Sequence, residues 1–312
     1  MMNNFTNKIL KFIFIINCIS ITYNINAQQL PNFIQSRDLQ FLMNPAYVSD
    51  NYLWRDQNVE VTAGYRYQWA GLKEAPNTAM ASFHYHNETY NISWGGHVVN
   101  DQTGPTSNSA AYARFAYHVG LGNDMKLAIG GAAGMAQYRV AGEKLVFNEQ
   151  NDIAKENNSR IYPDFALGTF LYKPRSFYVG ISTPQTLGLN LQYRNTLREY
   201  DIKKVRHFYA GGGGFIKMND DRDVFEPSMW IRYVPNAPLN ADLNLKYEYN
   251  DTWWLTLGAS TSRALHFDTG LLLDTNNDNL LHIGYGFGYN FQTYGPQFGF
   301  THEIVLAYSW KY

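Results

Sequence analysis

Histidine side chains are the first candidates for chemistry in this sequence. His84 and His86 stand two residues apart in a stretch with the period of a β-strand, so their side chains share one face. One interpretation is a metal site that also takes in His118 and His282. A metal needs three or four converging ligands, which one His-x-His pair does not supply. We therefore expect the alternative, a polar face of hydrogen-bonded side chains without a metal.

Other arrangements that carry chemistry are missing from the sequence. The acidic run from Asp274 to Asp278 is spaced faintly like a calcium loop, but it lacks the central glycine and the terminal glutamate. No Gly-x-Ser-x-Gly elbow occurs. The net charge of -1 gives no reason to expect a nucleic-acid partner. We therefore predict that the protein is not an enzyme and binds no cofactor.

The N-terminus has the three parts of a signal peptide. Lysines supply the positive charge, residues 12–21 form an apolar run, and Ala27 ends the leader on a small residue. A membrane-spanning helix would need roughly 20 apolar residues, so this run is too short. We predict that residues 1–27 are removed on export. The only cysteine, Cys18, lies in this leader, so we expect no disulfide or thiolate site in the mature chain.

A period of two dominates the sequence from about residue 57 to the end. Alternate residues of a strand face opposite sides, so the pattern predicts strands with two different environments. It is clearest at 59–69, 239–249 and 281–291. A soluble sandwich also alternates, but its strands usually have about 5–6 residues, whereas about 9–11 residues cross a bilayer when tilted. The length of these stretches therefore favours a membrane barrel.

Composition and connections agree with a barrel. Charged residues make up 16% of the chain, below the usual quarter of a soluble domain, and the chain contains 24 Tyr, 19 Phe and 7 Trp. Tight turns alternate with longer connections, as short periplasmic turns alternate with external loops in such barrels. We predict an all-β outer-membrane β-barrel of about 14 antiparallel strands at 57–312. Residues 28–56 lack the alternation and are interpreted as an N-terminal segment, periplasmic or lumenal.

The predicted strands lie near 57–69, 78–87, 90–99, 107–119, 124–138, 160–172, 175–183, 204–218, 224–234, 238–249, 252–261, 264–274, 279–291 and 298–312.

The last strand ends in a pattern of its own. Every second residue is apolar or aromatic and the chain stops on an aromatic, which resembles the signal that barrel-assembly machinery recognises in bacteria. We expect that machinery and outer-membrane lipid to be partners of the chain. The residues are Ile304, Leu306, Tyr308, Trp310 and Tyr312.

Charges in the middle of a strand identify the inward face. A lysine or arginine facing lipid near the midplane costs roughly 2–4 kcal/mol. Arg66, Arg114, Asp242 and Lys246 should therefore point into the lumen. The inward glycines at 284, 286 and 288, together with the run 211–214, predict a crowded lumen or a bent wall.

Four short motifs, in order, resemble the PorP/SprF family of Bacteroidetes outer-membrane proteins. They are an NPAY element, an Arg-x-Gln-Trp element, an Ala-Pro-x-Thr element and a Thr-His-Glu-Ile element. Two departures, Val48-Ser49 after the first element and Thr301 in the last, weaken the subfamily more than the family. The motif positions are Asn44, Pro45, Ala46, Tyr47, Arg66, Gln68, Trp69, Ala75, Pro76, Thr78, His302 and Glu303.

The resemblance implies a role in type IX secretion and gliding motility. Family members support the export of secreted adhesins with a type B C-terminal domain and hold them at the surface. The resemblance leaves open further contacts with periplasmic motor or ring components. The loops at 139–159 and 184–203 are then the expected docking surfaces. The alternative function is a diffusion channel or uptake porin, which the physics of a barrel permits equally.

The position of two motifs predicts a contact. The first and last strands of a closed barrel are neighbours, so Arg66 and Glu303 should lie close to each other across the seam. The functional interpretation is a family-specific site, and the alternative is that these residues only close the barrel.

Overall fold

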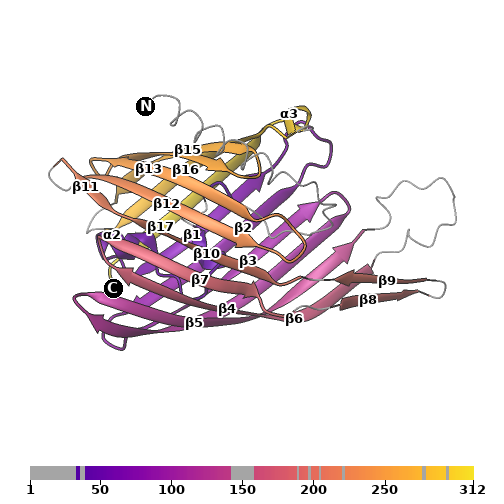
Figure 1. The fold of residues 1–312 in the computed structure, drawn as a ribbon, viewed down its shortest axis with the longest axis horizontal. Helices are drawn as coiled ribbons and strands as arrows, with labels where there is room; N and C mark the ends of the chain where they lie inside the picture. The colour runs from indigo at the N-terminus through magenta and orange to yellow at the C-terminus, as the bar shows by residue number, and fades with distance from the viewer. Residues whose placement is uncertain are drawn as a thin grey trace, which may run out of the picture.

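A computed structural model describes residues 33–35, 39–141, 158–187, 190–195, 198–203, 205–219, 222–275, 279–292 and 295–312. The predicted signal peptide at 1–27 lies outside these residues. The described chain forms one antiparallel sheet that closes on itself and a separate two-stranded hairpin (Figure 1). Among the described residues, no helix is long and apolar enough to cross a membrane.

The wall of the barrel has 14 strands, because β10 and β11 together form one strand interrupted at Phe215. All 14 predicted strands are confirmed, with ends that differ by a few residues. The strands of the wall are β1 (Val59–Tyr67), β2 (Asn77–Asn87), β3 (Ile92–Thr103), β4 (Thr106–Gly122), β5 (Met125–Val140), β6 (Asn158–Lys173), β7 (Phe177–Gln185), β10 (His207–Gly214), β11 (Ile216–Met218), β12 (Asp223–Tyr233), β13 (Asn240–Tyr249), β14 (Trp253–Ser260), β15 (Ala264–Asp274), β16 (Leu280–Asn290) and β17 (Thr301–Trp310).

Neighbours in sequence are neighbours in the wall, with two further pairings. The first strand pairs with the last, from Val59 opposite Trp310 to Tyr67 opposite His302. β10 pairs with both β7 and β12. The hairpin that lies between β7 and β10 in the sequence is therefore not part of the wall. The apolar positions of the last strand face outward, since Ile304 and Leu306 are about half exposed, while Glu303 and Val305 are buried. The outward apolar face is the one that lipid covers.

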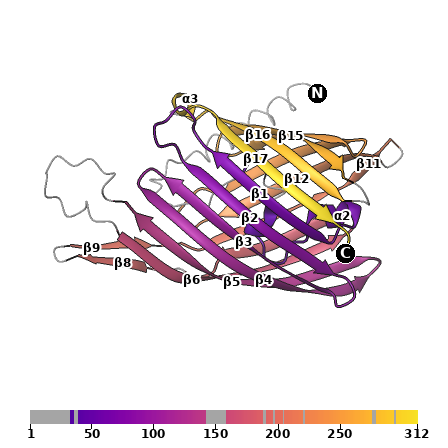
Figure 2. The ribbon, with the colours of Figure 1, turned by 180° about the vertical axis from the view of Figure 1, so that it is seen from behind.

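The wall is taller on one side. β4 has 17 residues and β5 and β6 have 16 each, whereas β14 has eight. About 9–11 residues are enough to cross a bilayer. Figure 2 shows these long strands continuing toward the hairpin of β8 (Asn190–Asn195) and β9 (Arg198–Lys203). The predicted loop 184–203 is therefore in part a regular hairpin, while most of the predicted loop 139–159 lies outside the described residues.

In the part of the chain that the structure describes, three short helices complete the fold: η1 (Gln40–Leu42), α2 (Asp50–Arg55) and α3 (Gly295–Phe298). The sequence of α2 explains its limits. The Ser49 hydroxyl accepts a hydrogen bond from the Tyr52 amide at 3.3 Å, which caps the first turn. Asp56 ends the helix in the left-handed conformation, with φ of 63°. Asp50 in the first turn and Arg55 in the last turn both match the helix dipole.

Candidate functional site: the filled lumen

The N-terminal segment fills the barrel. We define its described residues, 33–35 and 39–58, as the plug. Leu39, Val48 and Leu53 of the plug are fully buried in a hydrophobic core that also contains Phe170 and Tyr178 of the wall. The main hydrophobic core of the protein therefore lies inside the barrel, between plug and wall. The described part of the predicted segment 28–56 is thus packed against the inner face of the wall.

The NPAY element forms a tight turn against the inner wall. The Asn44 side-chain amide donates to the carbonyl oxygen of Thr169 on β6 at 3.1 Å. The Asn44 side-chain oxygen accepts from the amide of Ala46 at 2.9 Å, and the Tyr47 amide donates to the Asn44 carbonyl at 3.1 Å. On β7, the Ser182 hydroxyl donates to the carbonyl of Met43 at 2.7 Å. Asn44 therefore folds the turn and also fixes it to the wall.

Glycines at three positions of the wall leave space for this turn. Gly130 and Gly168 are directly paired in the register of β5 and β6. A Cβ atom at position 130 would lie 2.8 Å from Ala46 Cα, and one at position 168 would lie 2.1 Å from the Asn44 side-chain oxygen. At Gly180 on β7 it would lie 2.8 Å from the Asn44 side-chain nitrogen. These three glycines, which we call the glycine seat, let the plug backbone approach the sheet.

The first described residues of the plug bind the part of the wall opposite the glycine seat. The amides of Ile34 and Gln35 each donate to the Glu303 carboxylate at 2.8 Å. A second group of glycines lies beneath them on β16. A Cβ at position 286 would come within 3.0 Å of the Ile34 side chain, and one at position 284 within 2.1 Å of the Gln35 side chain. The expectation of a crowded lumen is confirmed at these positions.

Three of the four family motifs meet at the closing seam. Arg66 on β1 is paired in register with Glu303 on one side and with Thr78 on the other. Thr78 is paired with Asp101 of β3 and donates to its carboxylate at 2.6 Å. The predicted proximity of Arg66 and Glu303 is therefore confirmed. Because Glu303 also binds the plug amides, the seam and the plug share one buried carboxylate.

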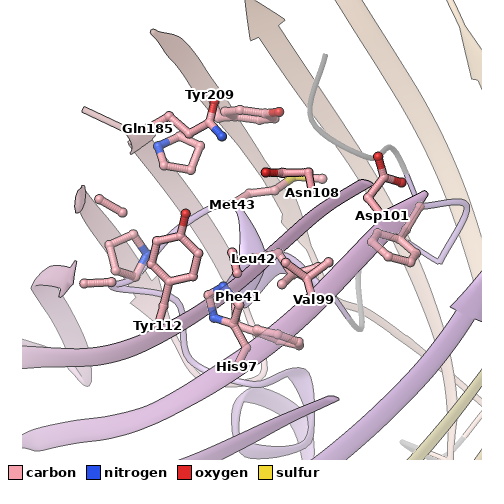
Figure 3. A pocket seen from close by; sticks show the side chains of 16 residues that line it. Phe41, Leu42, Met43, His97, Val99, Asp101, Asn108, Tyr112, Gln185 and Tyr209 are labelled. Atoms are coloured by element: carbon pink, nitrogen blue, oxygen red, sulfur yellow. The ribbon is translucent and has the colours of Figure 1, made fainter. Parts of the chain in front are cut away.

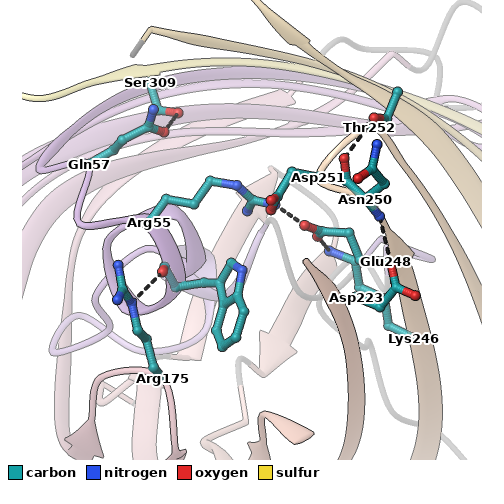
Figure 4. Close-up of polar contacts among 11 residues, drawn as sticks. Arg55, Gln57, Arg175, Asp223, Lys246, Glu248, Asn250, Asp251, Thr252 and Ser309 are labelled. Carbon is teal, nitrogen blue, oxygen red and sulfur yellow. Dashed lines mark hydrogen bonds and ion pairs between the residues drawn. The ribbon is translucent and has the colours of Figure 1, made fainter. Parts of the chain in front are cut away.

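Charged side chains fix the end of the plug at the turn side of the barrel, which is the end where the short turns connect the strands (Figure 4). Arg55 forms ion pairs with Glu248, near the end of β13, and with Asp251 in the following turn. Arg175, in the turn after β6, donates through its side chain to the Trp54 carbonyl at 3.1 Å and through its amide to the Leu53 carbonyl at 2.8 Å.

A further ion pair and three hydrogen bonds join the plug to the end of the last strand and the two residues after it, one of them from the Asn58 side-chain amide to the Tyr312 carbonyl at 3.1 Å. Lys311 pairs with Asp56. The Ser309 hydroxyl donates to the Gln57 side chain at 2.5 Å, and the Tyr312 amide donates to the Asn58 side chain at 2.7 Å. The plug is thus tied at its start, its middle and its end.

The inward charges and histidines are where the sequence predicts them. Arg66, Arg114, Asp242 and Lys246 are all buried, as is His84. Arg114 forms a hydrogen bond with His84.

Two further histidines pack against aromatic rings beneath α2. His86 lies between Tyr52 and His118, with ring-centroid distances of 4.3 and 4.5 Å. The His118 ring nitrogens lie 2.9 Å from the Ser93 hydroxyl and 3.0 Å from the Tyr172 hydroxyl. No three His, Cys, Asp or Glu side chains of the described residues are grouped to hold a metal ion.

A tyrosine of the plug forms a hydrogen bond with a glutamate in the turn after β2. The Tyr52 hydroxyl donates to the carboxylate of Glu88 at 2.6 Å. Burial, first, and this hydrogen bond raise the pKa of the Tyr52 phenol above its usual value. The hydroxyl therefore stays protonated and continues to tie α2 to the turn after β2.

The remaining motif positions lie at the rim near the long connections. Ala75 is buried, and Pro76 accepts the backbone hydrogen bond of Gln68 at 2.8 Å. Trp69 packs on Phe298 of α3, and His302 faces outward, 2.7 Å from the Tyr285 hydroxyl. These residues do not join the seam contacts of Arg66, Thr78 and Glu303. The functional role of every motif position stays a prediction.

The sequence alone does not identify the residues by which the wall holds the plug in place. The glycine seat and Arg55 carry no local signal, because their contacts are to residues more than 80 positions away in the chain. The only signal available was the inward parity of these glycines on predicted strands. It indicates a crowded lumen without naming the segment that fills it.

A closed, antiparallel barrel with an apolar outer face and a filled lumen is an outer-membrane β-barrel protein. The chain belongs to the family of type IX secretion system membrane proteins PorP/SprF, whose family model matches residues 25–308. The protein is therefore an outer-membrane component of the type IX secretion system. The predicted family and location are confirmed.

One of two similar solved structures supports the barrel fold, namely the one with a TM-score above 0.5. A monoaromatic hydrocarbon channel, CymD, is 10% identical with a TM-score of 0.51, over 90% of this chain and 94% of that one. A FadL homologue from Pseudomonas aeruginosa is 9% identical with a TM-score of 0.48, over 90% and 95% of the two chains. A comparison with curated proteins gives no match. At 10% identity the likeness to CymD concerns the fold alone.

Proposed function

We propose that this barrel is a non-enzymatic scaffold that supports the export of an adhesin with a type B C-terminal domain and anchors it at the cell surface. The observation that carries the proposal is the plug. A lumen occupied by a segment tied at its start, middle and end is suited to holding a partner and poorly suited to passing solutes. The alternative, a diffusion channel or uptake porin, needs an open route through the lumen, and the plug occupies part of that space.

The tall side of the wall is the surface we assign to the partner. β4, β5 and β6 are longer than a bilayer requires, and the hairpin β8–β9 stands next to them. In the described chain, the two strands of this hairpin pair only with each other. Its outer edges therefore retain backbone donors and acceptors that a β-rich partner can use.

The turn side of the barrel offers a second contact surface. The charges that fix α2 lie there, and periplasmic components of the secretion system are the partners we assign to it. Arg55 and Asp251 lie at this side, which is the side of the short connections.

A gentle detergent pull-down with mass spectrometry tests the proposal. The full-length protein should co-purify with a large secreted adhesin. A variant in which a short Gly-Ser linker replaces residues 190–203 should lose the adhesin while the barrel still assembles. The matched control alters the tight turn 87–89 on the opposite side and should keep the adhesin. Deletion of the protein should remove the adhesin from the cell surface and leave solute uptake unchanged, whereas impaired uptake with a normal surface adhesin would favour the porin alternative.

A further inference from the structure

The tall side of the wall ends in a strand edge that stays open in the described chain. β6 pairs with β5 as far as Asn158, its first residue. Its pairing with β7 covers only the other half of the strand and ends at Leu167. One further hydrogen bond joins the Thr186 amide to the Phe165 carbonyl at 2.8 Å. Beyond Phe165, toward the long connections, β6 is therefore an edge strand, since neither β8 nor β9 pairs with it.

The alternation of β6 shows which backbone groups lie at this edge. Successive residues of a strand direct their N–H and C=O groups to opposite neighbours. The Phe165 carbonyl is directed toward β7, so the backbone groups of Pro163, Ile161 and Ser159 are directed to the same side. Proline has no N–H to donate, and within sheets it is found chiefly at open edges. Pro163 agrees with this assignment, and Ile161 and Ser159 each present one donor and one acceptor.

This edge lies beyond the lipid-covered band of the outer face. On β4 the outward side chains are apolar from Leu121 to Ala111, a length of strand that suffices to cross a bilayer. The next outward residue, Ser109, is polar, and it stands in one row of the register with Gln137 and Ile161. Unpaired backbone groups are not tolerated against hydrocarbon. The position of the row leaves the edge accessible to a partner from the aqueous side.

Cross-strand side chains hold this end of β6 in place. On the inner face, the Tyr112 hydroxyl donates to the Asp164 carboxylate at 2.8 Å, and the Tyr162 hydroxyl donates to the Asn108 side chain at 3.3 Å. Asn108 and Tyr112 also line a pocket together with Met43 of the plug (Figure 3). The edge is thus fixed from within the barrel. A preorganised edge loses little conformational freedom on binding, which favours affinity.

The outer side of the edge carries an exposed apolar side chain. Ile161 is 65% exposed although its row neighbours Ser109 and Gln137 are polar. A strand paired with this edge would place a side chain directly beside Ile161 on the same face. A β-branched or aromatic residue suits that place, because such residues pair favourably across strands.

We infer that residues 159–163 of β6 form a site for β-strand addition, where an extended segment of a partner polypeptide pairs with Ile161 and Ser159. An extended backbone supplies donors and acceptors at the spacing of the edge, which is how peptides add to open sheets. The occupant is a partner rather than the chain's own hairpin, because β8 and β9 pair with each other along their whole length. That the partner is the adhesin rests on the proposed function, whereas the site itself does not.

Amide hydrogen exchange at Ile161 tests the site in the full-length protein with isotope-labelled isoleucine. Exchange should be fast in the free protein and slow about tenfold when an end-blocked Lys-Thr-Val-Thr-Val-Lys peptide saturates the edge, because the amide gains a hydrogen bond. The same peptide with every amide N-methylated cannot donate and should leave the rate unchanged. Ile129, inside the wall between β4 and β6, is the internal control and should exchange slowly throughout. An Ile161 amide that is protected in the free protein, or indifferent to the peptide, would overturn the inference.

Two substitutions separate the backbone from the side chain. Ile161→Pro removes the donor at the edge without removing a hydrogen bond of the wall, so the barrel should assemble. The peptide should then fail to slow exchange of the Ser159 amide. Ile161→Thr keeps both the donor and a β-branched side chain, and the peptide should bind within about twofold of its native affinity. Equal protection of Ser159 in the two variants would contradict pairing at this edge.

The adhesin pull-down distinguishes the site from its partner. Ile161→Pro should release the adhesin, whereas Ile161→Thr should retain it. An adhesin retained by Ile161→Pro would overturn its assignment to this edge. Absence of the adhesin from the native pull-down, with peptide protection of Ile161 intact, would contradict the proposed function and leave the site standing.

Discussion

At the residue scale, three glycines of the wall determine where the plug lies. Gly130, Gly168 and Gly180 each admit plug atoms at distances that a Cβ would forbid. Asn44 then uses both ends of its side chain, one for the turn and one for the wall. The NPAY element and the glycine seat are therefore complementary parts of one contact. We expect changes on either side to loosen the plug without unfolding the wall.

Gly130→Ala tests this contact. The new methyl group would lie 2.8 Å from the backbone of Ala46, and overpacking of this kind typically costs about 1–3 kcal/mol. We expect faster amide hydrogen exchange at residues 44–48, read by mass spectrometry. Gly131→Ala is the matched control, because its nearest neighbours would be 3.6 Å away. Equal exchange in the two variants would show that the seat does not hold the turn.

The pair Arg66 and Glu303 lends itself to a double-mutant cycle. Either Arg66→Met or Glu303→Gln leaves a buried charge without its partner, which typically costs about 3–5 kcal/mol. The double variant should lose less than the sum of the two, with a coupling of about 1–3 kcal/mol. Urea unfolding of the protein in vesicles measures it. A coupling near zero would mean that the two residues are neighbours in register without an energetic link.

The sequence predicts which face of a strand these residues occupy, but not the residues that they contact. Inward parity and the cost of a charge in lipid place Arg66, Arg114, Asp242 and Lys246 correctly, because a strand has only two faces. The same parity places Arg66 beside Glu303 once the barrel closes. It does not say what each inward residue contacts, since the plug follows no period that fixes its register against the wall.

At the scale of elements, the strands form because alternation repeats over lengths that cross a bilayer, and this local signal suffices to predict them. The plug and the hairpin β8–β9 differ from the strands. The plug is held by contacts such as Ile34 to Glu303, separated by 269 residues. No local pattern predicts such contacts, so the segment looks irregular in sequence and yet is packed in the structure.

Arg55→Gln tests how α2 is fixed. The variant loses the ion pairs to Glu248 and Asp251, and hydrogen bonds to charged groups contribute about 1.5–3 kcal/mol each. We expect amide exchange within α2 to rise roughly 10- to 100-fold. Arg222→Gln, which removes an exposed hydrogen bond to Asn250 in the same region, is the control. Unchanged exchange in Arg55→Gln would mean that packing alone holds the helix.

At the scale of the whole molecule, the barrel and its plug form one body with an internal core. Aromatic residues from both parts meet there, as when Tyr47 packs edge-on against Phe170 at 5.4 Å and Trp54 packs against Phe215 at 5.5 Å. We expect such a core to keep the lumen closed. We expect a barrel closed in this way to act through partners at its rim, as the proposed function requires.

The conductance of the purified protein in a planar lipid bilayer tests the central claim most directly. A barrel closed by its plug should insert without steady current, and Gly168→Leu, which places a side chain where Asn44 lies, should produce channel openings. Gly131→Leu on the outer face should remain silent. Steady, solute-passing current through the native protein would contradict the closed lumen and restore the diffusion channel as its function.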